Sequence, residues 1–470
     1  MGAGAPPLPR PRAKSTGPRE ALQPTHRSVA AARRMQLLVV RSGPSARARS
    51  PGRSAGRGAG RSPSATPRSA HAGPDPIGDP RDLNVVMISI DSLRADMPWA
   101  GYPRPIAPFL TRLESEAVSY TRAYATSSYT SQSVGGFLGG RLASELRRDG
   151  YFFGTYPSRV VFFPERLQAA GIRTIAAQSH GYFRAGHAGF EQGFDVWRMV
   201  PGTHWNATTD VDITSVPHAD LAIRLLSEPA NTSGRFFAWF HFMDPHDQYQ
   251  SHPGISYGRR MRDRYDGEVT FTDREVERLV TFIRSQPFGA RTAIVITADH
   301  GESFGEHGHY RHAFQVWQQL VRVPWFFSIP GVAPRRIAAS RSHVDLAPTL
   351  LELFGLPPEP EFTGRSLVPE FLGAEPEARD VWVDLARTGN NDRRRALIHG
   401  QYKLTAYGDD SRFELYDIEA DPGELTNLAR TRPEVYASMV RRYREAQPGI
   451  RNEHVRGCRT LTGAPPGRGW

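Results

Sequence analysis

The sequence predicts an α/β protein in which helices flank a mostly parallel sheet, followed by a smaller C-terminal α+β subdomain of antiparallel strands. Three observations support this prediction. Near-continuous apolar runs, typical of strands buried on both faces, alternate with segments of helical periodicity. Towards the C-terminus the pattern changes to short strands separated by turns. The 470 residues are enough for about two or three domains with a large buried core.

Four apolar runs predict the parallel strands, and helical patterns separate them. The runs are "NVVMISID" at 84–91, "RTIAA" at 173–177, "RFFAWFHF" at 235–242 and "TAIVITA" at 292–298. Helices are expected at 106–118, at 163–171, where Gly171 ends the helix, and at 273–286, where Asp273 is expected to cap the N-terminus. Another helix is expected in "HVDLAPTLLELFGLPP", where Gly355 and two prolines end it. This alternation favours a sandwich around a parallel sheet.

The chain divides into four predicted parts. Residues 1–82 form a basic tail rich in Arg, Pro, Gly and Ser, which lacks apolar periodicity and is expected to be disordered. Residues 83–378 form the main domain. Short strands within 381–429 and a helix at 433–446 form the C-terminal subdomain, 379–450, and 451–470 are expected to be loose.

The net charge of +11 comes entirely from the tail. Residues 1–82 hold 15 Lys and Arg against 4 Asp and Glu, so the other 388 residues hold 44 of each. Because the body is neutral, we do not expect nucleic acid as a partner, although the tail itself could contact an anionic surface. A solvated tail or a misassigned start codon explains the same sequence.

Cysteine content and apolar segments limit the class of protein further. The single cysteine, Cys458, excludes an intramolecular disulfide and a cysteine metal cluster. No stretch reaches the roughly 18 apolar residues of a membrane span, and "MQLLVV" at 35–40 is too short for a signal-peptide core. We therefore expect a soluble chain as written. Its location stays open, because a missing true N-terminus could carry an export signal to the periplasm or beyond.

Polar residues follow three of the predicted strands where each strand ends. Asp91 closes the first strand, Asp244, His246 and Asp247 follow the third, and Asp299 with His300 follows the fourth. Ligands of open parallel sheets bind at the carboxyl ends of the strands. Each Asp alone could be a turn or cap residue. Together they predict a site for one divalent cation, and Mn²⁺, Mg²⁺, Ca²⁺ and Zn²⁺ all suit carboxylates with an imidazole.

The segment "DHGESFGEHGHYRH" adds a group of histidines beside the last strand end. His300, His307, His309 and His312 lie within 13 residues of one another in a turn-rich stretch. A lone histidine is often a packing or surface residue. Four beside a strand-terminal Asp favour a polar pocket, although they cannot all be metal ligands.

These segments resemble the sulfatase branch of the alkaline phosphatase superfamily over about residues 83–445. The matching stretches, in order, are "NVVMISIDSLRAD", "HFMDPHDQY", "VITADHGESFGEHG", "RVPWFFSIPG", "HVDLAPTLLELFGLP" and "FELYDIEADPGELTNLA". The resemblance implies an α/β/α core with a small C-terminal subdomain. It also implies one divalent metal held by Asp91, Asp299 and His300. Ser92 stands where many sulfatases have a second Asp.

The resemblance further implies a nucleophile within "TSSYTSQSVGGFLGGR". Sulfatases carry Cys-x-Pro-Ser-Arg about ten residues before a Gly-Arg pair, and its Cys is oxidised to formylglycine. Counting back from Gly140 and Arg141 puts Thr130 at the Cys position, within "TSQSV". "TSQS" resembles the threonine-nucleophile segment of lipoteichoic acid synthases and phosphoethanolamine transferases.

Thr130 is therefore expected to be both the nucleophile and a fourth metal ligand, since coordination makes a hydroxyl acidic enough to attack. Gly135 and Gly136 are expected to let the backbone approach an anion at the start of a helix. His246 is the expected acid or oxyanion contact, or else a structural neighbour of the site. His309 and His312 are expected to bind substrate behind it.

Three functions remain open at this point. The first is a threonine-dependent phosphodiesterase or phosphotransferase, and the second is a sulfuric ester hydrolase without formylglycine. The third is a non-catalytic binding protein. The expected substrate is a small-molecule, lipid-linked or glycan-linked phosphate or sulfate ester.

Overall fold

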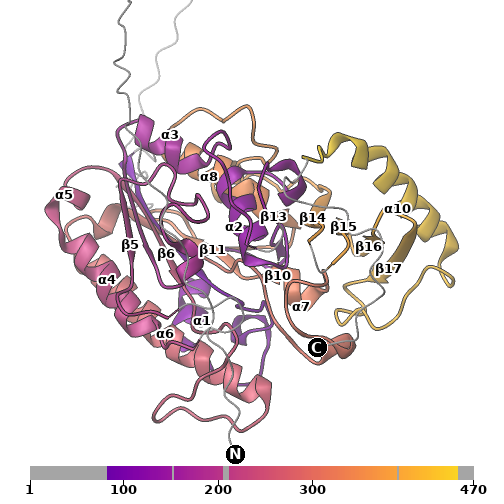
Figure 1. The fold of residues 1–470 in the computed structure, drawn as a ribbon, viewed down its shortest axis with the longest axis horizontal. Helices are drawn as coiled ribbons and strands as arrows, with labels where there is room; N and C mark the ends of the chain where they lie inside the picture. The colour runs from indigo at the N-terminus through magenta and orange to yellow at the C-terminus, as the bar shows by residue number, and fades with distance from the viewer. Residues whose placement is uncertain (1–81, 151–152, 205–210, 389–390, 454–470) are drawn as a thin grey trace, which may run out of the picture. The chain divides into compact units, whose positions relative to one another are not determined.

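The structure is a computed structural model that describes residues 82–150, 153–204, 211–388 and 391–453. The predictions of a disordered tail at 1–82 and a loose end at 451–470 therefore fall almost entirely outside the described residues. The largest sheet has eight strands in the order β12-β2-β11-β7-β1-β6-β4-β5 (Figure 1). Its strands are β1 (Asn84–Ile90), β2 (Val118–Tyr120), β4 (Arg173–Gln178), β5 (Val196–Met199), β6 (Phe236–Phe242), β7 (Thr292–Thr297), β11 (Trp325–Ser328) and β12 (Arg335–Ile337).

The four predicted strands form the parallel centre of this sheet. β1 lies between β6 and β7 and is parallel to both, and β4 continues the parallel order on the far side of β6. β11 runs antiparallel to β7 and β2, so the sheet is mostly, not wholly, parallel. The predicted α/β class is confirmed. The carboxyl ends of β1, β6 and β7 consequently meet at one edge of the sheet.

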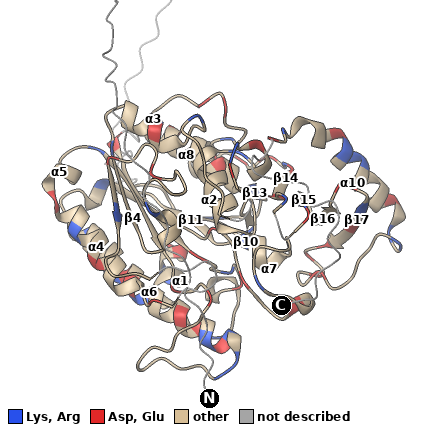
Figure 2. Cartoon of the chain, viewed as in Figure 1, with Lys and Arg blue, Asp and Glu red and all other residues tan. Residues whose placement is uncertain are grey.

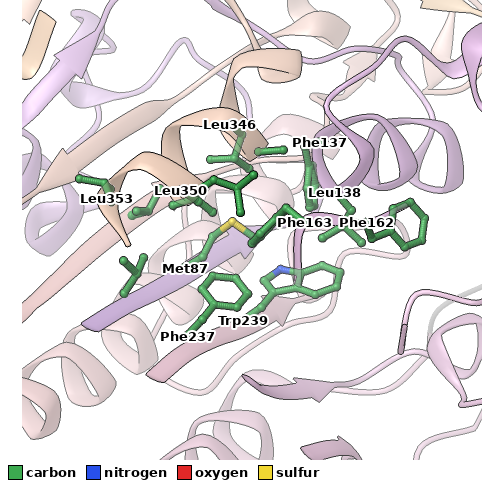
Figure 3. Packing of buried hydrophobic residues seen from close by; sticks show 14 of the residues in the cluster. Met87, Phe137, Leu138, Phe162, Phe163, Phe237, Trp239, Leu346, Leu350 and Leu353 are labelled. Carbon is green, nitrogen blue, oxygen red and sulfur yellow. The ribbon is translucent and has the colours of Figure 1, made fainter. Parts of the chain in front are cut away.

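Helices cover both faces of the sheet, as the continuous burial of its strands requires. One face packs on α1 (Pro108–Ser115), α4 (Ser215–Ser227) and α6 (Met261–Ser285), and the other packs on α2 (Thr130–Gly139), α3 (Phe163–Ala169) and α8 (Leu346–Leu353) (Figure 1). Figure 3 shows the second layer, where side chains of β1 and β6 meet α2, α3 and α8. These contacts hold α2, and with it Thr130, against the centre of the sheet.

Helix α6 differs from its prediction at one end. It begins at Met261, not at Asp273, and Asp273 lies buried in its interior. The carboxylate of Asp273 accepts the backbone N–H groups of Phe109 and Leu110 at 3.0 and 2.8 Å. It thus satisfies unpaired donors at the start of the neighbouring helix α1. Asp273 is a capping residue, as expected, but for a different helix.

The C-terminal sheet is antiparallel and lies between two layers. It consists of β14 (Val381–Leu385), β15 (Arg394–His399), β16 (Tyr402–Tyr407) and β17 (Arg412–Asp417). One face packs on α10 (Pro433–Ala446), and the other packs on residues around Tyr124 and Leu320 of the main layer.

The remaining elements are short. They include a three-stranded sheet of β10 (Arg322–Val323), β3 (Ala123–Tyr124) and β13 (Arg341–Ser342), and a hairpin of β8 (Ser303–Phe304) and β9 (Tyr310–Arg311). The short helices are α5 (Pro229–Thr232), α7 (Gln318–Val321) and α9 (Val368–Phe371).

Strand β14 is fastened to the segment that carries Thr130. The N–H of Asp384 donates to the carbonyl of Thr126 at 2.8 Å. The side chain of Gln132 pairs with both backbone groups of Ala386, accepting its N–H at 2.9 Å and donating to its carbonyl at 3.2 Å. The C-terminal sheet therefore supports the start of α2 directly.

Charged residues lie mainly on the outer helices, while the central strands are largely uncharged (Figure 2). Among the described residues, no helix combines the length and apolar character that crossing a bilayer requires.

Replacing Asp384 by Ala should lower the free energy of unfolding by about 3–5 kcal/mol. Asp384 is fully buried and pairs with the equally buried Arg395 at 3.0 Å, so its removal leaves a buried guanidinium without its carboxylate. Urea denaturation followed by circular dichroism measures the change. Asp380→Ala is the matched control, because Asp380 pairs with the half-exposed Arg442 and should cost about 1 kcal/mol or less. Equal losses of unfolding free energy in the two variants would contradict the larger stabilisation expected from the buried pair of Asp384 and Arg395.

Candidate active site

The carboxyl ends of β1, β6 and β7 bring three of the predicted polar residues together, whereas Asp244 binds the start of α4 and Asp247 pairs with Arg311. Asp91 follows β1, and Asp299 and His300 follow β7, while the backbone N–H of Asp91 donates to the carbonyl of Phe242 at the end of β6 at 2.8 Å. All three side chains are fully buried. The nitrogen Nε2 of His300 lies 3.3 Å from Oδ2 of Asp299 and 3.8 Å from Oδ1 of Asp91.

Thr130, the first residue of α2, also lies beside this group. It comes from the helix layer that contains α3 and α8. Its Oγ1 lies 3.0 Å from Nε2 of His300 and 3.5 Å from Oδ2 of Asp91. The preceding residue, Tyr129, is extended and gives no side-chain cap to the helix. The hydroxyl of Ser133, one turn further, donates to the carbonyl of Asp299 at 2.5 Å and fixes α2 against the end of β7. The structure thus places Asp91, Thr130, Asp299 and His300 in one cluster.

The donors and acceptors of the cluster fit a bound cation. Oδ1 of Asp299 accepts the backbone N–H groups of Ser92 and His300 at 3.3 and 3.0 Å, but its Oδ2 is buried without a hydrogen-bond partner among the described residues. Nδ1–H of His300 donates to the carbonyl of Gly301 at 2.9 Å, which leaves Nε2 as an acceptor. Acceptors therefore face one another, and a divalent metal ion is the partner that such a donor set suits.

The two carboxylates of the cluster have opposite pKa shifts. Burial raises the pKa of Asp91, but the hydrogen bond from His241 and the nearby imidazoles of His246 and His300 outweigh burial, so its pKa lies well below the usual value. Burial raises the pKa of Asp299, and the charge of Asp91 adds to this rise. Burial also lowers the pKa of His300, which favours its neutral, metal-binding form.

His241 is a residue of the site that sequence reasoning missed. It lies near the end of β6, and its Nε2 is 3.3 Å from Oδ2 of Asp91. A ligand atom each from Asp91, His241 and Asp299 lie within 4.8 Å of one another. The available signal was a single histidine within an otherwise apolar and aromatic strand, "RFFAWFHF".

His246 and His312 lie beside the cluster, and the histidine rings form a row. The ring of His312 stacks on His300 with centroids 4.2 Å apart and meets His246 at 5.0 Å. Nδ1 of His246 bonds the carbonyl of Asp247 at 2.6 Å, and Nδ1 of His312 lies 3.2 Å from the buried Glu302. His180, which sequence reasoning also missed, lies close enough to this row of histidines for their charge to affect its pKa. Burial lowers its pKa to about 4, and His246 contributes to the shift.

The other two histidines of this segment are placed differently. His309 is in the β8–β9 connection, and among the described contacts its side chain has none with the cluster; its predicted role in substrate binding stays a prediction. His307 stacks on Trp317 with centroids 3.9 Å apart, which is a packing role.

Gly135 and Gly136 do not serve the purpose that the sequence suggested. A Cβ atom at Gly135 would lie 2.3 Å from the hydroxyl of Tyr156, and one at Gly136 would lie 2.2 Å from Oγ1 of Thr126. The two glycines therefore make room for side chains that pack on α2. The start of the helix, at Thr130, is the part that faces the cluster.

Comparison with known proteins gives matches along most of the described chain. The sulfatase family model matches residues 83–356, and the model of the C-terminal part of N-sulphoglucosamine sulphohydrolase matches residues 305–447. Choline-sulfatase of Rhizobium meliloti (strain 1021) is 32% identical over 174 residues, which cover 36% of this chain and 33% of that protein. Arylsulfatase K of Bos taurus is 27% identical over 220 residues, covering 43% and 41%. The matches thus span about a third to two fifths of these relatives.

Solved structures confirm the fold over a larger part of the chain. A phosphonate monoester hydrolase of Agrobacterium radiobacter has a TM-score of 0.64 at 17% identity, covering 78% of this chain and 96% of that one. A 2-O GAG sulfatase also has a TM-score of 0.64, at 19% identity, covering 78% and 91%. At these identities the likeness concerns the fold alone.

Mn²⁺ should raise the melting temperature of the wild-type chain, and Asp299→Asn should remove most of that rise. At about 100 times Kd, binding to the folded state adds about 2.7 kcal/mol of stability. The metal-free variant should melt no lower than the metal-free wild type, because burial and Asp91 already disfavour the ionised form of Asp299.

Differential scanning calorimetry with and without chelator measures both effects. Asp345→Asn is the matched control, because the buried Asp345 pairs with Arg379 outside the cluster. It should lower the melting temperature and keep the Mn²⁺ response. An undiminished response in Asp299→Asn would exclude Asp299 as a ligand.

Proposed function

The chain belongs to the sulfatase family of hydrolases, and we propose that it cleaves phosphate or sulfate esters by using Thr130 as a nucleophile, with phosphodiesters preferred. The observation that carries the proposal is the position of the Thr130 hydroxyl at the start of α2, within 3.0 Å of His300 and 3.5 Å of Asp91. No cysteine is near this position in the sequence, because the single cysteine is Cys458. A formylglycine made from cysteine is therefore excluded at this position.

The residues around Thr130 support the binding of an anionic ester. The N-terminal end of α2 carries the positive end of the helix dipole and N–H groups that lack intrahelical acceptors. A phosphoryl or sulfuryl oxygen is the ligand that such a helix end attracts. The two carboxylates of the cluster would repel this anion if they were uncompensated.

Asp91, Asp299, His300 and Thr130 would hold the divalent metal ion on which enzymes of this family depend. The bound ion would offset the carboxylate charge and make the Thr130 hydroxyl more acidic. Metal identity is not specified by this donor set, which suits Mn²⁺, Mg²⁺, Ca²⁺ and Zn²⁺.

The reaction proceeds in two displacements. Oγ1 of Thr130 releases its proton to solvent and bonds to the phosphorus or sulfur, and the bond from that atom to the leaving oxygen breaks. His246 donates a proton to the leaving oxygen. Water, or an acceptor alcohol in a transfer reaction, then attacks the threonine ester and gives its proton to His246, and the displaced oxygen of Thr130 takes a proton back from solvent.

His246 suits this role because of its place and its hydrogen bond. It is half-buried, it is close enough to Asp91 to lower the pKa of that residue, and its Nδ1 bonds the carbonyl of Asp247. That bond leaves Nε2 as the nitrogen that exchanges the proton. His312, stacked between His300 and His246, contributes to substrate binding beside it.

Sulfate ester hydrolysis is the second candidate function. It is favoured by the match of residues 305–447 to the C-terminal part of N-sulphoglucosamine sulphohydrolase and by relatives named choline-sulfatase and arylsulfatase K. The substrate would then be a small or glycan-linked sulfate ester. The phosphodiester preference rests on the threonine at position 130. A lipid-linked phosphate ester and a glycan-linked one satisfy this preference equally.

Thr130→Ala should lower turnover at least about 10³-fold on every substrate that the wild type cleaves. The assay uses Mn²⁺, Mg²⁺, Ca²⁺ or Zn²⁺ with aryl phosphodiester, phosphomonoester and sulfate ester substrates. Ser128→Ala removes a nearby hydroxyl that bonds the carbonyl of Gln315, and its turnover should stay within about threefold of wild type.

The same assay separates the candidate functions. Full activity in Thr130→Ala would refute the nucleophile, and activity on sulfate esters alone would establish the second function. Inactivity of the wild type with all four metals would favour a binding protein on this fold. Mass spectrometry of acid-quenched wild type should find the phosphoryl or sulfuryl group on the peptide that contains Thr130.

His246→Gln should slow cleavage of alkyl esters by about 10²–10⁴-fold and of nitrophenyl esters by less than tenfold. A nitrophenolate leaves without protonation, whereas an alkoxide needs the proton. The slope of log kcat/KM against the pKa of the leaving alcohol measures this difference. An equal loss for both classes would assign His246 to binding instead of proton transfer.

A further inference from the structure

Trp239, Ser89 and His241 form a chain of buried hydrogen bonds that ends at Asp91. Nε1–H of Trp239 donates to Oγ of Ser89 at 2.8 Å, and Oγ of Ser89 lies 2.7 Å from Nδ1 of His241. Nε2 of His241 lies 3.3 Å from Oδ2 of Asp91. All four residues are fully buried, on the neighbouring strands β1 and β6 and immediately after β1.

The first donor, Trp239, fixes the direction of donation in all the hydrogen bonds of this chain. An indole nitrogen can only donate, so the oxygen of Ser89 accepts from Trp239. The hydroxyl proton of Ser89 then has Nδ1 of His241 as its acceptor, and that nitrogen is unprotonated. A neutral imidazole with an unprotonated Nδ1 carries its proton on Nε2, which therefore donates to Asp91.

The opposite arrangement leaves a buried donor unsatisfied. If Nδ1 of His241 carried the proton, Oγ of Ser89 would receive N–H groups from both Trp239 and His241. Among the described contacts, the hydroxyl proton of Ser89 would then have no acceptor. Buried polar groups without partners are strongly disfavoured, so this arrangement is the weaker one.

His241 and His300 consequently have opposite tautomers around one carboxylate pair. His300 donates from Nδ1 to the carbonyl of Gly301 and presents an accepting Nε2, whereas His241 presents a donating Nε2. An N–H group cannot bind a metal ion. Proximity alone would group His241 with Asp91 and Asp299 as a ligand, but the hydrogen bonds exclude it.

We propose that His241 is a positioning residue that orients Asp91 through the chain Trp239 to Ser89 to His241, and that it is not a metal ligand. Ser92 then donates to Oδ1 of Asp91 at 2.9 Å, and His241 donates to Oδ2, which Thr130 also reaches at 3.5 Å. This orients both oxygens towards Thr130 and His300. The inference rests on the proposed metal site and adds the residues that shape it.

Packing holds Trp239, the first donor of this hydrogen-bond chain, in a fixed position. Its ring meets Phe137 of α2 edge to face, with centroids 5.7 Å apart, and Figure 3 shows its indole within the core between β6 and the helices. The same helix carries Thr130. The orientation of Asp91 and the position of the nucleophile are therefore set by one packed layer.

Histidine ring ¹⁵N shifts of the metal-free full chain test the tautomer directly. We expect a proton on Nε2 of His241, assigned by the signal lost in His241→Gln, and a proton on Nδ1 of His300. Trp239→Phe should give His241 a mixture of tautomers, because it frees the hydroxyl of Ser89. Trp325→Phe is the matched control, since the indole N–H of Trp325 is buried on the same face without a partner among the described residues. A His241 protonated on Nδ1 in the wild type would overturn the proposal.

Mn²⁺ affinity by calorimetry tests the positioning role. His241→Leu and Ser89→Ala should weaken binding by about 10–100-fold, whereas His241→Gln, whose amide can both accept and donate, should stay within about threefold of wild type. Circular dichroism verifies that each variant is folded. Electron spin-echo spectroscopy of bound Mn²⁺ should detect one coordinated nitrogen, from His300.

The outcomes separate this inference from the proposed function. Two coordinated nitrogens in the wild type, with one lost in His241→Gln, would overturn the positioning role and leave the metal site intact. A wild type that binds no Mn²⁺, Mg²⁺, Ca²⁺ or Zn²⁺ would overturn both.

Discussion

Two carboxylates buried side by side at the end of a parallel sheet are the constraint around which this protein is organised. Asp91 and Asp299 are fully buried, and among the described contacts no Lys or Arg pairs with either. Their negative charge is met by N–H and O–H donors and by the positive end of α2, and a bound cation would complete the compensation. The parallel neighbours β6 and β7 bring these groups to the same point.

Much of the fold was predictable because burial on both faces leaves a strong sequence pattern. The runs at 84–91 and 292–298 are mainly apolar and hold no charged residue before the strand end, where Asp91 and Asp299 follow. The start of α6 was not predictable in the same way. Asp273 has the sequence signature of a cap, but only the packing of α6 against α1 shows which helix receives its carboxylate.

Local sequence patterns likewise identified some residues of the site and missed others whose contacts are long-range. Asp91, Asp299 and His300 follow apolar runs, so strand ends identified them. His241 lies within such a run, and its importance depends on its pairing with Ser89 across the sheet, which no local pattern reveals. The glycines at 135 and 136 were misread for the same reason, since the side chains that fill their space come from outside the helix.

The bonds between Gln132 and Ala386 join residues that are 254 positions apart. A chain growing on a ribosome holds the sequence of α2 long before β14 exists to pair with it, so the start of that helix remains without two of its supports through more than half of synthesis. Long-range closure of this kind slows folding and exposes intermediates. Moving the C-terminal sheet onto another α/β domain would therefore also require that domain to supply a side chain in the place of Gln132, to pair with the backbone of Ala386.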